Sequence, residues 1–537
     1  MEQRSKQTGD DEVLLNIFNV GRKRFKVYFH QNVVKWQRLE ARGNAENTEK
    51  KSTSISMNDI INVTLKPSNG SSGAQIHPSL DIGSPSALTS PTASDFKTFT
   101  IHYVTELRRH GKRDTAELKH NSISFCSSDF SLVRHWFLAL HESLRVFRET
   151  RPKNLLLFVN PYSGKRNALI VYEKYAKPLF QIANVNVTCI ISQRAEQISD
   201  IIMEQELERY DGLVIVGGDG TFSEAFNGLI RKYLNQNLHL RLDDEAFSRI
   251  CDIPIGIIGS GSTDCVAYSL YGSSDPTTAV LNIILGTKYG LDLASIRNED
   301  DELVKMYCSA LSYGYLGDII RKSEKYRKWL GPRRYEFTGF KEFFKNNGYN
   351  VEITYLMDDH ASTEDRQTCC GTTNCSRCTK VASNDTKNDR KEQWRTITGK
   401  FFMISAANIK CACKKSPNGI SPSCHFSDGY IDIICVRHTT IFNNIKLLLT
   451  LSKNDKDIAD LAFVERIRTR KFKFRALEKN RNDDFTNTNS TQTIERSSIE
   501  GLSSFNCDGE LLLDPYVTVS GHRQILKVFK KSTFPSV

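Results

Sequence analysis

The residue types best suited to phosphate chemistry stand in Gly217-Gly-Asp-Gly220, directly after the apolar run 213–216 and before a helix-like stretch, 222–230. An uninterrupted apolar run is typical of a strand covered on both faces. Glycines let backbone N–H groups approach a phosphate without interference from a Cβ atom, and the start of the following helix favours the same anion. The pattern predicts a phosphate site with one acid, Asp219, which could act as general base for a hydroxyl that attacks a nucleoside triphosphate.

Three further segments could complete such a site. Asn160-Pro-Tyr-Ser-Gly164 and Ile258-Gly-Ser-Gly-Ser-Thr-Asp264 each end an apolar run, at the edge of a sheet where open α/β proteins bind ligands. Asn506-Cys-Asp-Gly-Glu510 places two carboxylates on either side of a glycine, where they could hold Mg²⁺ through waters or position the nucleotide. Each segment alone would also suit an ordinary turn or linker, so the prediction rests on their combination.

The elements that must position these segments fall into two regions. From 153 to 258 apolar runs alternate with helix-like segments, which indicates a parallel, doubly wound α/β nucleotide-binding domain over 151–290. Strand-like segments then dominate, which indicates an antiparallel β-sandwich domain over 291–537. Long polar loops or insertions are predicted at 67–94, 358–391 and 478–504.

Residues 1–150 carry short strand-like segments followed by one amphipathic helix, an order that resembles a pleckstrin-homology domain. The strand candidates are 13–18, 24–29, 33–39, 60–66 and 99–104. The helix has apolar residues at helical spacing over 132–147, with Ser128 or Asp129 as N-cap candidates. Two basic clusters, Arg22-Lys-Arg-Phe-Lys26 and Arg108-Arg-His-Gly-Lys-Arg113, could face anionic membrane lipids, although each would also suit a solvated loop.

The composition excludes several classes of protein. The chain has 537 residues and a formal net charge of +11, which suits either simple solubility or attraction to anionic lipid or nucleotide; no nucleic-acid partner is expected. No run approaches the roughly 20 apolar residues that span a bilayer, and the first thirty residues carry no secretory signal. The 14 cysteines are therefore expected to be reduced thiols. We expect a cytoplasmic protein that binds intracellular or plasma membranes peripherally.

Taken together, the four segments resemble the diacylglycerol kinase catalytic superfamily, which includes sphingosine and ceramide kinases. The resemblance runs from Lys153 to about Phe529, and its strongest part is Gly314-Tyr-Leu-Gly-Asp-Ile-Ile-Arg-Lys-Ser-Glu-Lys-Tyr-Arg327, continuing to Tyr335. Within this group the chain is most similar to the ceramide kinases, because of the pleckstrin-like region, Ser262-Thr-Asp-Cys265, the cysteine-rich stretch after 369 and Cys411-Ala-Cys-Lys-Lys-Ser-Pro417.

The resemblance implies transfer of the γ-phosphate of Mg-ATP to the primary hydroxyl of ceramide, giving ceramide 1-phosphate. It assigns Asp219 as the base, with Gly217, Gly218 and Gly220 lining the lipid site beside it. It assigns ATP to Asn160, Pro161, Tyr162, Ser163, Gly164, Ser192, Glu224, Ser260, Gly261, Ser262, Arg327, Arg334, Asp508, Gly509 and Glu510. Two arginines with Mg²⁺ would supply the positive charge that phosphoryl transfer needs.

Substrate choice is inferred from one position. Sphingosine kinases have an acidic residue two positions after the one that matches Asp318, where it recognises the free amine; this chain has Ile320 there, which suits an N-acylated lipid. A sphingosine or diacylglycerol kinase remains an alternative. NAD kinase shares the GGDGT pattern but has an Asn-Glu pair where this chain has Ser262-Thr-Asp264. A scaffold without catalytic activity is a third alternative, against which the intact acids and arginines argue.

Two regulatory features are suggested by the same resemblance. Cys370, Cys375 and Cys378 resemble the CxxxCxxC pattern of ceramide kinases, with one residue too many in the first gap. They suit either a structural Zn²⁺ site, with further ligands from Cys411, Cys413, Cys424 or His425, or a redox-sensitive loop without metal. The apolar stretch 441–451 lies where ceramide kinases resemble calmodulin targets, although an amphipathic helix of the β domain or a lipid-facing flap would fit it as well.

Overall fold

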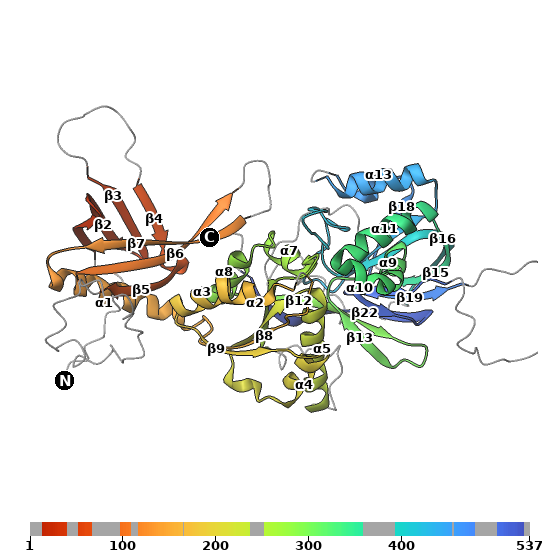
Figure 1. Ribbon diagram of the computed structural model, residues 1–537, viewed down its shortest axis with the longest axis horizontal. Coiled ribbons are helices and arrows are strands. Elements are labelled where there is room, and N and C mark those ends of the chain that lie inside the picture. The colour runs from red at the N-terminus through yellow and green to blue at the C-terminus, as the bar shows by residue number, and fades with distance from the viewer. Residues whose placement is uncertain are drawn as a thin grey trace, which may run out of the picture.

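The structure is a computed structural model that describes residues 13–39, 52–66, 97–108, 116–164, 166–236, 252–357, 392–453, 456–477 and 502–530. Three parts follow one another along its longest axis, in the order of the sequence (Figure 1). The N-terminal β domain is at one end, a helix-covered α/β domain is in the middle, and a sheet-rich domain with several helices is at the other end. The predicted fold class is confirmed.

The N-terminal domain is a seven-stranded antiparallel sheet closed by one helix. Its strands are β1 (Leu14–Val20), β2 (Lys23–His30), β3 (Val33–Arg38), β4 (Ser52–Ser56), β5 (Ile60–Lys66), β6 (Thr98–Arg108) and β7 (Ala116–Cys126), in the spatial order β4-β3-β2-β1-β7-β6-β5. Helix α1 (Phe130–Arg148) begins at the N-cap Asp129, and its Trp136 is fully buried against Phe18 and Phe99. β4 and β7 were not predicted, because neither shows a long apolar run or a regular apolar alternation.

The middle domain is the predicted parallel sheet. Its strands β8 (Asn154–Val159), β9 (Asn186–Ile191), β10 (Gly212–Gly217) and β11 (Pro254–Gly259) run parallel in the order β9-β8-β10-β11. Its main helices are α2 (Ala168–Val171), α3 (Lys177–Ile182), α4 (Gln197–Glu204), α5 (Asp219–Gln236), α7 (Cys265–Tyr271) and α8 (Pro276–Leu285). Val159 and Gly259 both pair with the end of β10, at Val216 and Gly217, so the three strands β8, β10 and β11 end level with one another.

The third domain is built from strands that are far apart in the sequence. They are β12 (Lys288–Arg297), β13 (Leu303–Tyr307), β14 (Ala310–Gly314), β15 (Tyr349–Leu356), β16 (Trp394–Ala407), β17 (Ile431–Arg437), β18 (Val464–Thr469), β19 (Lys471–Ala476), β20 (Phe505–Cys507), β21 (Glu510–Leu512) and β22 (Tyr516–Phe529). β22 pairs with β11, so this sheet continues the sheet of the middle domain. Three helices were not predicted: α9 (Tyr315–Ser323), α10 (Arg327–Leu330) and α11 (Arg334–Lys345). The stretch 441–451 forms the helix α13 (Ile441–Leu451), which was one of the alternatives considered for it.

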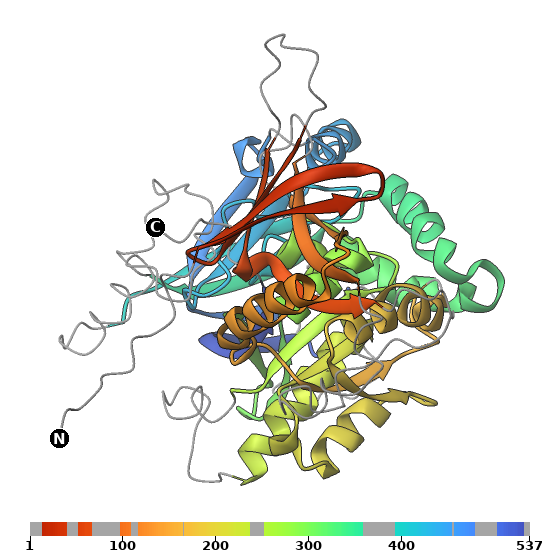
Figure 2. The same ribbon diagram turned by 90° about the vertical axis from the view of Figure 1, so that its left-hand side faces the viewer.

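The N-terminal domain packs directly on the middle domain (Figures 1 and 2). The Asn62 side chain donates a 2.7 Å hydrogen bond to the backbone oxygen of Ile182. The N–H of Leu118 on β7 donates to Thr278 Oγ1 on α8 at 3.1 Å. Ile61, Val104 and Leu118 belong to the hydrophobic core of the middle domain, so the two domains share buried apolar surface. Among the described residues, no helix is long and apolar enough to cross a bilayer.

Candidate active site

Three loops meet at the carboxyl ends of β8, β10 and β11. Asn160 follows β8 and donates from Nδ2 to Thr221 Oγ1 on α5 at 3.0 Å. The Gly218 N–H donates to Ser163 Oγ at 2.9 Å, and the Ser260 N–H donates to the Gly217 oxygen at 3.0 Å. The loops 160–164, 217–220 and 260–262, predicted separately from the sequence, are therefore held together by hydrogen bonds at one edge of the sheet.

Glycine is required in these loops because their backbones touch one another. A Cβ atom added to Gly164 would lie 2.5 Å from Gly261 Cα, and one added to Gly261 would lie 2.7 Å from Gly218 Cα. Gly164 also has φ +49°, in the left-handed region that favours glycine. The sequence pattern predicts glycines that give access to a phosphate, whereas in the structure at least three of them permit close contact between loops.

Asp219 opens α5, but its carboxylate receives its hydrogen bonds from a different helix. The N–H groups of Cys265 and Val266, at the start of α7, donate to its two oxygens at 3.0 and 2.8 Å. Asp264, directly before them, adopts φ +53° and accepts a 2.7 Å hydrogen bond from the Gly261 N–H. Asp219, a half-buried residue, thus ties the loop after β10 to the loop after β11.

The environment raises the pKa of Asp219 to about 6. Desolvation by the surrounding protein is the largest cause, and the nearby charges of Asp264 and Asp508 act in the same direction. The two backbone N–H donors oppose this rise because they stabilise the carboxylate. A carboxylate with a pKa near 6 is ionised at neutral pH and holds a proton better than an ordinary Asp, which is the property of a general base.

Within the described part of the chain, the Ser260 hydroxyl is a polar group without a hydrogen-bond partner at the edge of the sheet where β8, β10 and β11 end. Its Oγ is buried and has no hydrogen-bond partner among the described residues. Ser192 follows β9 and lies buried, with its N–H donating to the Val159 oxygen at 2.9 Å. An unpaired buried hydroxyl is costly, so Ser260 Oγ is suited to a polar ligand such as a nucleotide.

Glu224 lies one turn further along α5 and faces the start of α4. Its Oε1 accepts hydrogen bonds from the N–H groups of Ile198 at 2.8 Å and Ser199 at 3.4 Å. Burial raises the pKa of Glu224, and those two donors lower it. The carboxylate therefore stabilises the start of α4 and the loop that leads there from Ser192. Its predicted role toward the nucleotide stays a prediction.

The third domain contributes Asp508, Gly509 and Glu510 from the turn between β20 and β21. Asp508 is buried and accepts from the N–H groups of Cys308 and Ser309, both at 2.8 Å, and from Ser309 Oγ at 2.5 Å. Glu510 is half-exposed and pairs with Lys305. Its Oε1 would lie 3.8 Å from a Cβ atom on Gly220, so this turn faces the loop that carries Asp219.

The two predicted arginines lie on the helices that follow β14. Arg327 begins α10, and its side chain is outside the described part of the structure. Arg334 begins α11, is buried, pairs with Glu324 at 3.1 Å and stacks on the ring of Tyr335. The structure therefore places Arg334 against its own helices rather than in the three loops. Binding of the triphosphate by these arginines stays a prediction.

The helix α9 carries a buried carboxylate, Asp318, close to Ile320, the position from which substrate choice is inferred. Asp318 is buried, and its carboxylate is bound by Lys322 Nζ at 2.5 Å, Tyr349 Oη at 2.5 Å and Ser503 Oγ at 2.6 Å. Ile320, two residues later, is partly exposed. Because Lys322 already neutralises Asp318, this part of α9 offers no free carboxylate to an amine.

The predicted zinc ligands Cys370, Cys375 and Cys378 lie outside the described residues. Within the described part, no group of three or more His, Cys, Asp or Glu side chains could hold a metal ion, so Zn²⁺ has no structural support. Cys411, a suggested further ligand, is instead buried and donates from Sγ to the Ser309 oxygen at 3.3 Å.

Asp264, Lys305 and Ser309 contribute to the site but were not predicted. Asp264 stood inside a quoted motif without a role, and its contact with Gly261 could have been suspected from the short Gly-to-Asp spacing. Lys305 and Ser309 carry no sequence signal, because their partners Glu510 and Asp508 are about two hundred residues away.

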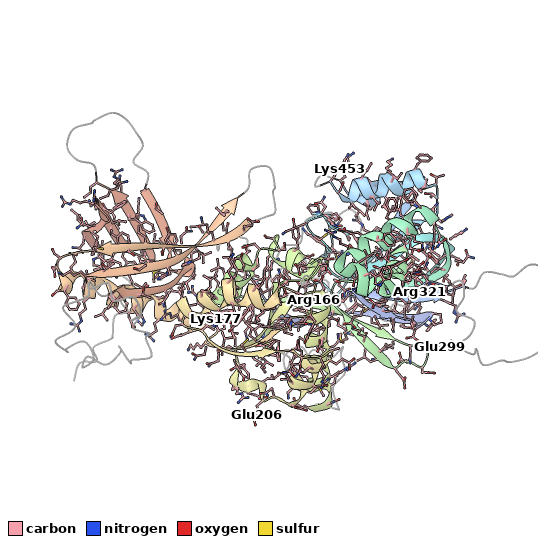
Figure 3. All side chains as sticks on the ribbon, in the orientation of Figure 1. Arg166, Lys177, Glu206, Glu299, Arg321 and Lys453 are labelled. Atoms are coloured by element: carbon pink, nitrogen blue, oxygen red, sulfur yellow. The ribbon has the colours of Figure 1, made fainter. Side chains whose placement is uncertain are left out.

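Figure 3 labels Arg166, just after the loop 160–164, near the middle of the molecule.

Comparisons with known proteins cover the same three parts. Family models match residues 14–140 (ceramide kinase PH domain), 154–296 (diacylglycerol kinase catalytic domain) and 308–534 (ceramide kinase C-terminal domain). A human ceramide kinase is 34% identical over 453 residues, covering 81% of this chain and 82% of the relative. A mouse ceramide kinase is 34% identical over 456 residues, covering 81% and 83%. The crystal structure of a diacylglycerol kinase from Bacillus anthracis is 15% identical with a TM-score of 0.42, covering 71% of this chain and 97% of that chain.

Proposed function

We propose that this chain, which belongs to the ceramide kinase family, transfers the γ-phosphate of ATP to the primary hydroxyl of ceramide with Asp219 as the general base. The observation that carries the proposal is the state of Asp219. The residue is half-buried, it lies where the loops 160–164, 217–220 and 260–262 meet, and its pKa is raised to about 6. Asp219 would accept the hydroxyl proton as the oxygen attacks the γ-phosphorus and ADP leaves.

ATP would lie along the loops 160–164 and 260–262. The buried, unpaired Ser260 Oγ supports a polar ligand there. Mg²⁺ would enter with the triphosphate. The donor set suits it only in part, since Asp508 already accepts three hydrogen bonds whereas Glu510 keeps Oε1 toward Gly220. Glu510 is therefore the carboxylate that would meet the ion, through water, and the metal would offset charge on the phosphates.

The lipid would approach from the side of α9. Two features favour an uncharged amide over a free amine: Ile320 is apolar, and Asp318 is neutralised by Lys322. A protonated amine buried there would lack a partner, which is costly. An N-acylated base such as ceramide carries no such charge.

The N-terminal domain would bring the enzyme to anionic membranes. Arg22, Lys23 and Arg24 are exposed around the β1–β2 turn, and basic residues near anionic lipid contribute roughly 1 kcal/mol each. Calmodulin binding to 441–451 stays a prediction.

The test is a substrate panel. Purified protein with Mg-ATP is offered ceramide, sphingosine and diacylglycerol in mixed micelles, and NAD in solution, and the labelled products are separated. We expect phosphate on ceramide, with the other three acceptors far weaker. Phosphorylation of sphingosine without ceramide would refute the assignment of substrate, and phosphorylation of NAD alone would refute the lipid assignment.

A further inference from the structure

Two helices of the third domain carry apolar residues on their outer faces. On α11 Phe337, Phe340 and Phe344 are 49%, 68% and 58% exposed, and on α13 Phe442 and Leu449 are 78% and 58% exposed. Ile445 and Leu448 of α13 and Trp329 of α10 are exposed as well. We call these eight residues the apolar face. Single exposed apolar residues are ordinary, but a gathering of eight on neighbouring helices is typical of an interaction site.

The helix α13 carries apolar residues on its outer face as well as on its inner face. Leu447 is buried with the polar Asn444 and Thr450, whereas Phe442 and Leu449 are exposed. A helix that only covers a core has apolar residues inside and polar residues outside. Asn444 is fully buried, and its Nδ2 donates to Asn346 Oδ1 at 2.7 Å. This contact fixes the orientation that exposes the apolar residues.

The same contact joins the two helices. Asn346 caps the end of α11, and its Nδ2 also donates to the Thr439 oxygen, just before α13, at 2.8 Å. Phe343 of α11 and Leu447 of α13 share one buried cluster against β16 and β17. Both helices therefore cover the same face of the sheet, and Figure 1 shows them on the outside of the third domain.

The charges around the apolar face are mostly positive. Exposed basic residues on these segments are Lys325, Arg333, Lys341, Lys345, Lys446 and Lys453, against the exposed acids Glu324 and Glu336. Lys453 is labelled beside α13 in Figure 3. Residues 441–453 contain no Asp or Glu. An apolar centre with a basic rim matches the interface of a bilayer that contains anionic lipid.

We infer that the apolar face of α10, α11 and α13 docks on an anionic bilayer, as a second membrane contact besides the N-terminal domain. The inference rests on the proposed function in one respect, because a lipid substrate has to leave a bilayer. The face also connects to the site: Tyr315 of α9 donates from Oη to the Gly339 oxygen of α11 at 3.1 Å. Gly317 of α9 touches the Ser504 oxygen, just before β20, closely enough that a Cβ atom would overlap it.

A bilayer fits this face better than calmodulin does. Calmodulin surrounds one basic amphipathic helix, whereas α13 carries a single lysine between its first and last residues and remains attached to the domain through Asn444. The apolar face also extends over α10 and α11, which are about a hundred residues earlier in the chain. A flat partner could contact all three helices at once.

The first experiment measures vesicle binding of the full chain without ATP or ceramide. Phosphatidylcholine vesicles with and without phosphatidylserine are sedimented with the parent, with the double variant Phe340→Gln/Phe442→Gln, and with the matched control Leu169→Gln/Ile170→Gln on α2. Removing two large apolar side chains from the contact should weaken binding to anionic vesicles by roughly tenfold or more. The control, whose residues are 42% and 64% exposed but lie outside the apolar face, should bind like the parent. Thermal unfolding should be unchanged in both double variants.

The second experiment reads insertion directly. The chain has four tryptophans; Trp329 is 90% exposed, whereas Trp36 and Trp136 are buried. Brominated phosphatidylcholine should quench the emission of the parent, and Trp329→Phe should remove most of that quenching. Equal vesicle binding by both double variants together with no quenching would overturn the inference. Two other results would also overturn the inference, because each would assign the apolar face to another occupant. The first is binding of calcium-loaded calmodulin that the Phe340→Gln/Phe442→Gln variant loses. The second is a dimer of the parent that this variant converts to a monomer. Because none of these readouts requires turnover, they are independent of the substrate panel.

Discussion

Asp219 and Asp508 lie in different domains, yet each carboxylate accepts hydrogen bonds from two consecutive backbone N–H groups of another segment. The two carboxylates differ in the number of hydrogen bonds that they accept and in the burial of the residue. Asp508 is buried and accepts a third hydrogen bond, from Ser309 Oγ, so more of its hydrogen-bonding capacity is used within the protein. Burial raises the pKa of both carboxyls, that of Asp219 to about 6, but Asp219 accepts only the two backbone hydrogen bonds and is half-buried as a residue. The comparison teaches that one acid holds the third domain together while the other remains available for chemistry.

Among the variants that keep Asp219, the largest expected effect comes from the loops that position it. In Gly261→Ala the new Cβ atom would lie 2.7 Å from Gly218 Cα and 2.9 Å from Asp264 Oδ1. Because backbone cannot move as a side chain can, we expect ATP affinity to fall more than tenfold and unfolding free energy to fall by about 1–3 kcal/mol. Calorimetry with ATP and urea unfolding measure the two effects.

Gly339→Ala on α11 is the matched control. Its Cβ atom would meet only Ile319 Cδ1 at 3.4 Å and Tyr315 Oη at 3.5 Å, so stability should be kept or slightly raised. Parent-like ATP affinity in Gly261→Ala would show that close loop packing does not form the nucleotide site.

Asp508→Asn tests the other side of the comparison. Its amide NH₂ group would face an N–H donor of Cys308 or Ser309, so we expect the unfolding free energy to fall by about 1–3 kcal/mol. Glu510→Gln, at a half-exposed position, should change it by less than about 0.5 kcal/mol. Urea denaturation measures both. If Asp508→Asn kept full stability but lost turnover, Asp508 would belong to the chemistry rather than to the scaffold.

Ile320→Asp should alter substrate choice. A carboxylate on the exposed side of α9 could pair with a free amine, so the ratio of kcat/KM for sphingosine to that for ceramide should rise roughly tenfold. Ile320→Asn adds polarity without charge and should leave the ratio nearly unchanged. If the ratio changed equally in Ile320→Asp and Ile320→Asn, charge at this position would not explain the choice between sphingosine and ceramide.

Asp264→Asn should produce the smallest effect, on pH dependence. The charge of Asp264 contributes to the raised pKa of Asp219, whereas its Oδ1 contact with Gly261 can be kept by Asn. Activity of the parent should be lost as the pH falls through about 6, because Asp219 becomes protonated. In the variant this acid limb of kcat/KM should move to lower pH. An unmoved limb would mean that another group controls it.

The middle domain was predictable because its signals are local. The runs that form β8, β10 and β11 are buried throughout, and each is followed by its own polar loop. That these loops lie together follows from the rule for parallel sheets. The hydrogen bonds from Cys265 and Val266 to Asp219 were not predictable, because they connect residues 46 and 47 positions apart.

The third domain was harder for two physical reasons. Its strands pair across long separations, as when β14 pairs with both β16 and β20, and the register of such pairs leaves little trace in a single sequence. Its helices α11 and α13 expose aromatic and aliphatic residues, so the usual rule of apolar inside and polar outside misreads them. The second failure concerns the region that we assign to the bilayer.

The most direct measurement is phosphoryl transfer by Asp219→Asn, which keeps the shape of the side chain but removes the base. With ceramide in mixed micelles and saturating Mg-ATP, kcat should fall roughly 10²–10⁴-fold, because proton acceptance is lost. ATP binding, measured on the same preparation, should stay close to that of the parent, whereas the unfolding free energy should fall by about 1–3 kcal/mol, because the new NH₂ group would face the N–H of Cys265 or Val266. Undiminished phosphorylation of ceramide by Asp219→Asn would contradict the account.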